Sequence, residues 1–137
     1  MKKIVLALFA AVAMVFGLVS CSGDLHDNPG LCYAHSVAGN ITAWNPGQFP
    51  LVVDSPMEYH LDFNSGSNTA GEFKIVPNTG WDPAFGGSAF TVNGDWKKFE
   101  EHKNNAANCT VTLVADTDYR ILIKVEGSDA YCKVVTR

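Results

Sequence analysis

A period of two in the apolar residues constrains the fold of this chain more than any other feature. In MEYHLDF, at residues 57–63, polar residues alternate with four apolar ones, which are Met57, Tyr59, Leu61 and Phe63. Successive side chains of a β-strand point to opposite faces of the sheet. The segment therefore predicts a half-buried strand, with its apolar face in the core and its polar face in water.

The same alternation recurs at residues 72–76, 110–115 and 119–126. We expect the inward positions of these segments to be Phe73, Ile75, Val111, Leu113, Tyr119, Ile121, Ile123 and Val125. Further strands are expected at 31–37, 49–54, 89–92 and 130–136. Turn-forming clusters such as Asn-Pro-Gly and Asn-Thr-Gly separate the runs. About eight short strands between turns predict an all-β, antiparallel β-sandwich.

One segment has the character of a helix. Asp95 could cap WKKFEEHKNN, at residues 96–105, where Trp96 and Phe99 are three residues apart. The sequence favours a short helix here, with a long polar loop as the alternative. No crossover helix of the length that parallel strands require lies between the expected strands, so an α/β fold is not expected.

The beginning of the chain has the pattern of a secretory signal. Lys2 and Lys3 precede an apolar run without charges, and Leu-Val-Ser-Cys follows at residues 18–21. This motif resembles the bacterial lipobox, in which the cysteine is lipidated. We therefore expect a lipoprotein signal peptide at 1–20, a flexible tether at 21–30 with lipidated Cys21, and a β-sandwich domain at 31–137. An uncleaved anchor is the alternative.

The charge of the chain argues against two classes of partner. The formal net charge is −4, and it becomes more negative when Lys2 and Lys3 are removed with the signal peptide. No run of basic residues remains to contact phosphates. Nucleic acid is therefore not expected as a partner, and acidic lipid headgroups are disfavoured for the same reason.

Three cysteines remain in the expected domain. An exported protein meets an oxidising compartment, so one disulfide is expected. Cys32 and Cys132 lie in the first and last expected strands, which often lie side by side in a β-sandwich. The pair Cys32–Cys132 is therefore preferred over Cys109–Cys132. Three buried free thiols, behaving as small apolar residues, are the alternative.

Enzymatic and metal-binding patterns are weak. The four histidines are scattered, and no nucleophile elbow, P-loop or His-Glu-x-x-His pattern is present. Glu100 and Glu101 are sequence neighbours, which do not face one another on a strand or a helix. Cys32 and His35 have a spacing that metal sites use, but on a strand they point to opposite faces. We expect no enzyme activity, no cofactor and no metal.

The tryptophans lie near turns rather than inside alternating strands. Trp44 occurs in NITAWNPG, Trp81 in NTGWDPAFGG and Trp96 in NGDWKKF. A loop tryptophan can fold back to cap a core. Its ring can also offer a flat apolar face, on which the C–H face of a sugar stacks. Lys74 points away from the core face of its strand, so its ammonium could bind sugar hydroxyls if the loops of Trp44 and Trp81 share one rim.

Several of these residues carry a family resemblance. GEFKI at residues 71–75, followed by Trp81-Asp82, resembles the signature of the SusE/SusF starch-binding lipoproteins of Bacteroidetes. YAHSVAGNITAWNPG is similar to the opening strand and turn of that family, and NCTVTLVADTDYRILIKVEG to its closing hairpin. The resemblance covers most of residues 31–136, and its specific part is Gly71 to Trp81.

The resemblance implies an immunoglobulin-like β-sandwich of carbohydrate-binding-module type, lipid-anchored in the bacterial outer membrane and exposed at the cell surface. It also implies a non-catalytic protein that binds starch or another α-glucan on Trp44 and Trp81, with Lys74 reaching glucose hydroxyls. Asn78 and Asp82 would add polar contacts. Other polysaccharide-uptake proteins of the envelope are further candidate partners. The rival interpretation is a structural or protein-interaction module of an envelope complex, without sugar binding.

Overall fold

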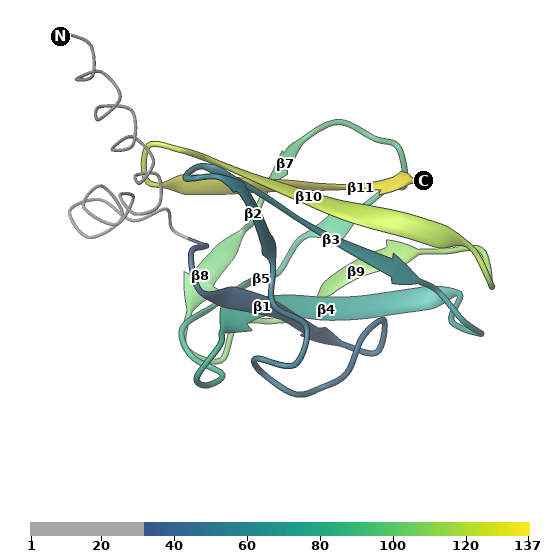
Figure 1. The fold of residues 1–137 in the computed structure, drawn as a ribbon, viewed down its shortest axis with the longest axis horizontal. Coiled ribbons are helices and arrows are strands. Elements are labelled where there is room, and N and C mark those ends of the chain that lie inside the picture. The colour runs from purple at the N-terminus through teal and green to yellow at the C-terminus, as the bar shows by residue number, and fades with distance from the viewer. Residues whose placement is uncertain (1–31) are drawn as a thin grey trace, which may run out of the picture. The chain divides into compact units, whose positions relative to one another are not determined.

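The computed structural model describes residues 32–137, which form two β-sheets packed face to face (Figure 1). The expected signal peptide, Cys21 and the tether lie outside the described residues. The strands are β1 His35–Gly39, β2 Val52–Ser55, β3 Glu58–Asn64, β4 Ala70–Pro77, β5 Ala84–Gly86, β6 Ala89–Phe90, β7 Lys97–Lys98, β8 Glu101–Lys103, β9 Cys109–Thr112, β10 Asp118–Glu126 and β11 Asp129–Thr136. Within this part of the chain, no helix has the length and apolar character needed to cross a bilayer.

The first sheet, called sheet A, contains β6, β9, β4, β5 and β8 in that order, and β1 also pairs with β4. The second sheet, called sheet B, has the order β2, β3, β10, β11 and β7. All strand pairs are antiparallel except β6 with β9, which is parallel. The predicted all-β sandwich with mostly antiparallel strands is therefore confirmed.

The core lies between the two sheets, and the period of two decides which side chains enter it. Phe73 and Ile75 of β4 are fully buried, as are Ile121 and Ile123 of β10 on the facing sheet. Tyr59, Leu61 and Phe63 of β3 are also buried, and polar residues alternate with them. The inward faces predicted from the alternation are confirmed, because burial of apolar area is what fixes the register of a half-buried strand.

The helix expected after Asp95 is wrong, because this segment forms β7, a turn and β8. Phe99 is buried in the core, where its ring lies 5.5 Å from that of Phe85. The buried hydroxyl of Ser88 donates to Lys98 O and accepts from Glu100 N, both at 2.9 Å. An extended backbone satisfies these contacts, so tertiary packing outweighs the modest local helix propensity.

The preferred Cys32–Cys132 disulfide is not formed, and Cys32, Cys109 and Cys132 are buried free thiols. The reasoning behind that pairing failed because the first and last strands do not lie side by side. β1 pairs with β4 in sheet A, whereas β11 pairs with β10 and β7 in sheet B. Burial raises the pKa of the Cys32 and Cys109 thiols to about 12. The thiols therefore act as small apolar residues of the core.

Candidate functional site

Two tryptophans from separate loops lie side by side on the surface. Trp44 belongs to the loop between β1 and β2, and Trp81 to the loop between β4 and β5. Their ring centroids are 6.4 Å apart, and the ring planes are inclined by 30°. Trp44 is 46% exposed and Trp81 is 42% exposed. A pair of large apolar rings, tilted toward each other and open to water, makes a shallow arched platform.

The loop that carries Trp44 folds back along β1. Gly39 N donates to Ala43 O at 3.1 Å, and Gly47 N donates to Ser36 Oγ at 2.8 Å. Residues 43–47 therefore run antiparallel to β1, from its end toward its beginning. This path carries the segment that contains Trp44 back alongside β1.

The loop that carries Trp81 is held at both ends. Gly80 N donates to Pro77 O at 3.3 Å, and the Asp82–Pro83 peptide is cis. Asp82 Oδ1 accepts a hydrogen bond of 2.8 Å from Asn105 N, a residue with positive φ in the turn after β8. Asp82 thus ties its loop to the neighbouring turn, a structural role that the sequence did not indicate.

The outer face of sheet A is built from small residues under these loops. Ala38, Val76, Ala84 and Ala106 form a second buried cluster, separate from the main core. Val76 and Ala84 belong to the outward-facing set of β4 and β5, yet they are fully buried. Small side chains let the two loops lie close to the sheet, and the loops in turn exclude water from it.

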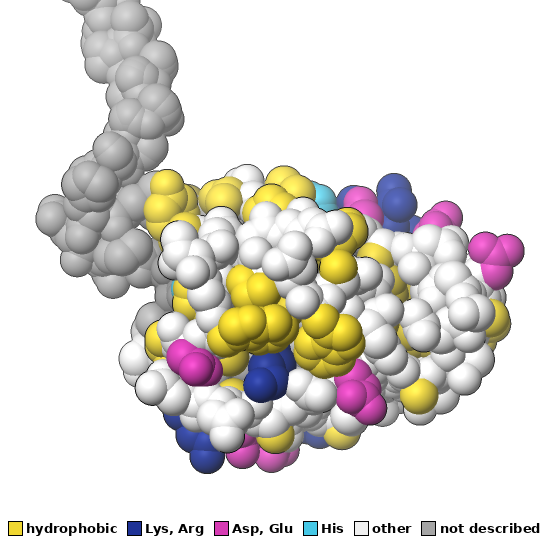
Figure 2. Space-filling model, turned by 90° about the horizontal axis from the view of Figure 1, so that it is seen from below, with side chains coloured by type: hydrophobic (Ala, Val, Ile, Leu, Met, Phe, Trp, Pro, Cys, Tyr) yellow, Lys and Arg dark blue, Asp and Glu magenta, His cyan; other side chains and the backbone are white. Residues whose placement is uncertain are grey.

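Lys74 lies on the same outer face. It stands opposite Ala38 in the β1–β4 register and is half-buried. Among residues 32–137, its ammonium forms no ion pair. Figure 2, which views sheet A from outside, shows large hydrophobic side chains clustered around one basic side chain. The structure therefore brings Trp44 and Trp81 together, and Lys74 projects from the outer face of sheet A.

Asn78 completes the set of residues singled out from the sequence. Its backbone N donates to Ala34 O at 2.9 Å, and its side chain is half-buried. The buried Oδ1 atom has no hydrogen-bond partner within the described part of the chain. The Asn78 carbonyl lies against Gly47, so Asn78 touches the Trp44 loop. Its backbone therefore contacts the loop of Trp44, and its side-chain oxygen is shielded from water.

Trp96 lies elsewhere and has a different environment. The ammonium groups of Lys124 and Lys133 are 4.7 and 4.9 Å from the centroid of its ring. Both lysines project from the outer face of sheet B, on the opposite side of the sandwich. Cation–π contacts occupy this half-buried ring, so Trp96 is packed against the domain and is not part of the platform.

Two features of the site escaped sequence reasoning. Gly47 has φ +87°, and a Cβ there would lie 2.6 Å from Asn78 O, so only glycine lets the two loops meet. Glu72 lies one position further along the outward face of β4 than Lys74. The Pro-Gly pair at 46–47 signals a turn, but nothing local reveals the segment against which that turn packs.

Neither a family model nor a curated protein matches this sequence. Among solved structures, the chain is similar to AmyP-SBD, a starch-binding domain whose structure is described as ligand-induced. The TM-score is 0.54 at 15% identity, and the match covers 77% of this chain and 74% of that chain. The similarity is one of fold. The chain is an all-β sandwich of the architecture found in a carbohydrate-binding module.

Proposed function

We propose that this protein is a non-catalytic carbohydrate-binding module that binds an α-glucan on the platform formed by Trp44 and Trp81. The observation that carries the proposal is the exposed, inclined indole pair, and Lys74 on the outer face of sheet A is its candidate polar partner. The fold similarity to a starch-binding domain and the sequence resemblance to SusE/SusF lipoproteins support it.

The chemistry of the platform suits a sugar chain. The face of an indole ring carries partial negative charge, and the C–H groups on one face of a pyranose carry partial positive charge. Stacking removes both surfaces from water. The Lys74 ammonium supplies three donors for hydroxyls at the edge of the sugar. Two rings inclined by 30° follow a curved ligand better than a flat one, which favours a helical α-glucan.

Substitution of the platform residues tests the proposal. We expect Trp81→Ala and Trp44→Ala each to weaken maltoheptaose binding by roughly 30-fold, because large aromatic residues at the centre of a site commonly contribute about 2 kcal/mol. Lys74→Met should weaken it by about tenfold or more, through loss of charge-assisted hydrogen bonds. Isothermal titration calorimetry measures all three.

Val114→Ala is the matched control, because Val114 is an exposed apolar residue, at 67%, in another loop. It should bind like the unsubstituted chain. Unchanged binding by both tryptophan variants would remove the platform from the function. Capture of a stoichiometric protein partner that the tryptophan variants lose, without any glycan binding, would instead support the protein-interaction module.

The cellular setting belongs to the same proposal. The lipobox-like Leu-Val-Ser-Cys supports a lipid anchor on Cys21 and a place in the bacterial outer membrane, where other polysaccharide-uptake proteins would be neighbours. Labelling with radioactive palmitate, followed by membrane fractionation, tests the anchor. A Cys21→Ser variant should lose both the label and the membrane association.

A further inference from the structure

The outward face of β4 continues beyond the aromatic pair. Lys74 and Glu72 are two positions apart on this strand, so their side chains project from the same face about 7 Å from one another. Asn40 binds both backbone polar groups of Glu72. Asn40 N donates to Glu72 O at 3.0 Å, and Asn40 Oδ1 accepts from Glu72 N at 2.8 Å.

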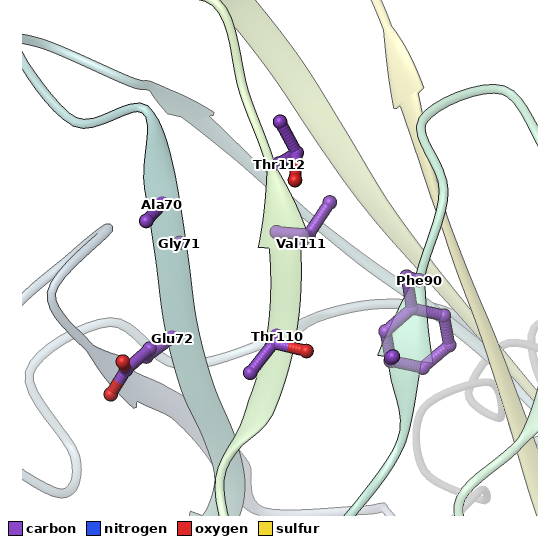
Figure 3. Close-up of a pocket in the computed structure, with 8 residues that line it drawn as sticks. Ala70, Gly71, Glu72, Phe90, Thr110, Val111 and Thr112 are labelled. Atoms are coloured by element: carbon purple, nitrogen blue, oxygen red, sulfur yellow. The ribbon is translucent and has the colours of Figure 1, made fainter.

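A shallow groove of about 200 Å³ begins at Glu72 and runs across β4, β9 and β6. Figure 3 shows its wall, with the Thr110 side chain between the β4 residues and the Phe90 ring. Thr110 stands opposite Glu72 in the register, and Thr112 is also exposed. The groove therefore combines a carboxylate with two hydroxyls, which are polar groups that can bind the hydroxyls of a sugar chain.

We propose that this groove is a second subsite, which binds sugar units beyond those stacked on Trp44 and Trp81. The inference rests on the proposed function. It extends that function by saying how far the ligand must reach and which charge it can carry. The path runs past Lys74 and Glu72 on β4 to Thr110 on the neighbouring strand β9. A ligand must therefore be longer than the platform to reach the groove.

The charge of the groove selects the class of glycan. Glu72 Oε1 accepts a hydrogen bond of 3.2 Å from Asn108 Nδ2, which leaves the other carboxylate oxygen for a sugar hydroxyl. A uronic acid or a sulfated sugar would place like charge beside this carboxylate. The ligand class is accordingly a neutral oligosaccharide, long enough to contact both the indoles and the groove.

Calorimetry of the full chain with maltotriose and with maltoheptaose tests the subsite. The unsubstituted chain should bind the longer sugar more tightly. Glu72→Ala and Thr110→Val should each reduce that preference by about fivefold, the effect of one ordinary hydrogen bond, and leave maltotriose binding unchanged. Valine keeps the β-branched shape of threonine, so only the hydroxyl is removed.

Glu58→Ala is the matched control, since Glu58 is an exposed glutamate on the outward face of β3 in sheet B. It should leave both affinities unchanged, and equal thermal midpoints would show that all variants are folded. A maltoheptaose preference that both groove variants retain would overturn the subsite and leave the platform intact. Absence of glycan binding by the unsubstituted chain would overturn the proposed function, and the subsite with it.

Discussion

Gly47 is the residue on which the geometry of the indole pair depends. Its φ of +87° is a conformation that other residues adopt at a cost, and the Asn78 carbonyl occupies the space that a Cβ would need. The Trp44 loop therefore touches the Trp81 loop through a glycine. The absence of a side chain at residue 47 therefore lets the loops of the two tryptophans lie in contact.

We expect Gly47→Ala to weaken glycan binding by separating the loops, and to destabilise the fold by about 1–3 kcal/mol. The added Cβ would meet Asn78 O at 2.6 Å in a conformation that already disfavours alanine. Thermal unfolding should show a lower midpoint, by about 4–8 °C for each kcal/mol in a domain of this size. Calorimetry with maltoheptaose measures the loss of binding.

Gly66→Ala separates the two causes, because Gly66 also has positive φ, at +59°, but nothing lies within 4 Å of the added Cβ. This variant should lose some stability and keep its affinity. If Gly47→Ala and the unsubstituted chain bind maltoheptaose with equal affinity, the loop contact does not determine the geometry of the platform.

At the scale of elements, β1, β5 and β8 meet around one phenylalanine. The Phe85 ring stacks on His102 at 3.8 Å and lies 5.8 Å from His35. Burial lowers the pKa of His35, a hydrogen bond with Tyr33 O opposes this, and the nearby His102 adds to the lowering. Burial also lowers the pKa of His102. Folding therefore favours the neutral form of both imidazoles.

This arrangement predicts that the fold loses stability in mild acid. A histidine whose pKa is lowered by folding binds its proton more readily in the unfolded chain. Its contribution to the stability of the fold is complete above its ordinary pKa of 6.5. That contribution is lost as the pH falls through the lower pKa of the folded state. The thermal midpoint should therefore drop between about pH 7.5 and about pH 5.

The His35→Gln variant identifies the group responsible, since glutamine cannot titrate and retains a hydrogen-bond donor for Tyr33 O. Its thermal midpoint should depend less on pH across this interval than that of the unsubstituted chain. His60→Gln is a comparison on the outer face of sheet B, where His60 contacts Asp54 at 2.8 Å. An unaltered pH profile in the His35 variant would assign the loss to another group, such as His102, whose pKa is also lowered by burial.

At the scale of the whole molecule, the core between the sheets contains the three domain thiols. Cys32, Cys109 and Cys132 are each 0% exposed, and burial is the main cause of their raised pKa values. Only the thiolate is an effective nucleophile. A reagent therefore reaches these groups only after the domain opens.

We expect iodoacetamide to label Cys32, Cys109 and Cys132 at the rate of global unfolding. Labelling should be slow in buffer and complete within minutes in denaturant, as measured by mass spectrometry of peptides. A destabilising core variant, Ile121→Ala, should lose about 2–5 kcal/mol and accelerate labelling of all three sites together. Rapid labelling of one thiol in the native chain would contradict its burial.

The predictions that succeeded used local rules, and those that failed needed the sheet topology. The alternation in β3, β4 and β10 identified the buried residues, because strand geometry alone sets that period. The helix after Asp95 failed because Phe99 is anchored in the core. The Cys32–Cys132 pair assumed that the first and last strands lie side by side, whereas β1 and β11 belong to different sheets.

The sequence by itself determined the two-sheet, all-β character, placed Trp44 and Trp81 in turns and put Lys74 on an outward strand face. Those features depend on residues close together in the chain. Only the tertiary structure decided that the two tryptophans meet at 6.4 Å and that Trp96 does not join them. The physical reason is that contacts between distant loops depend on which strands pair, and that choice is made by burial over the whole core.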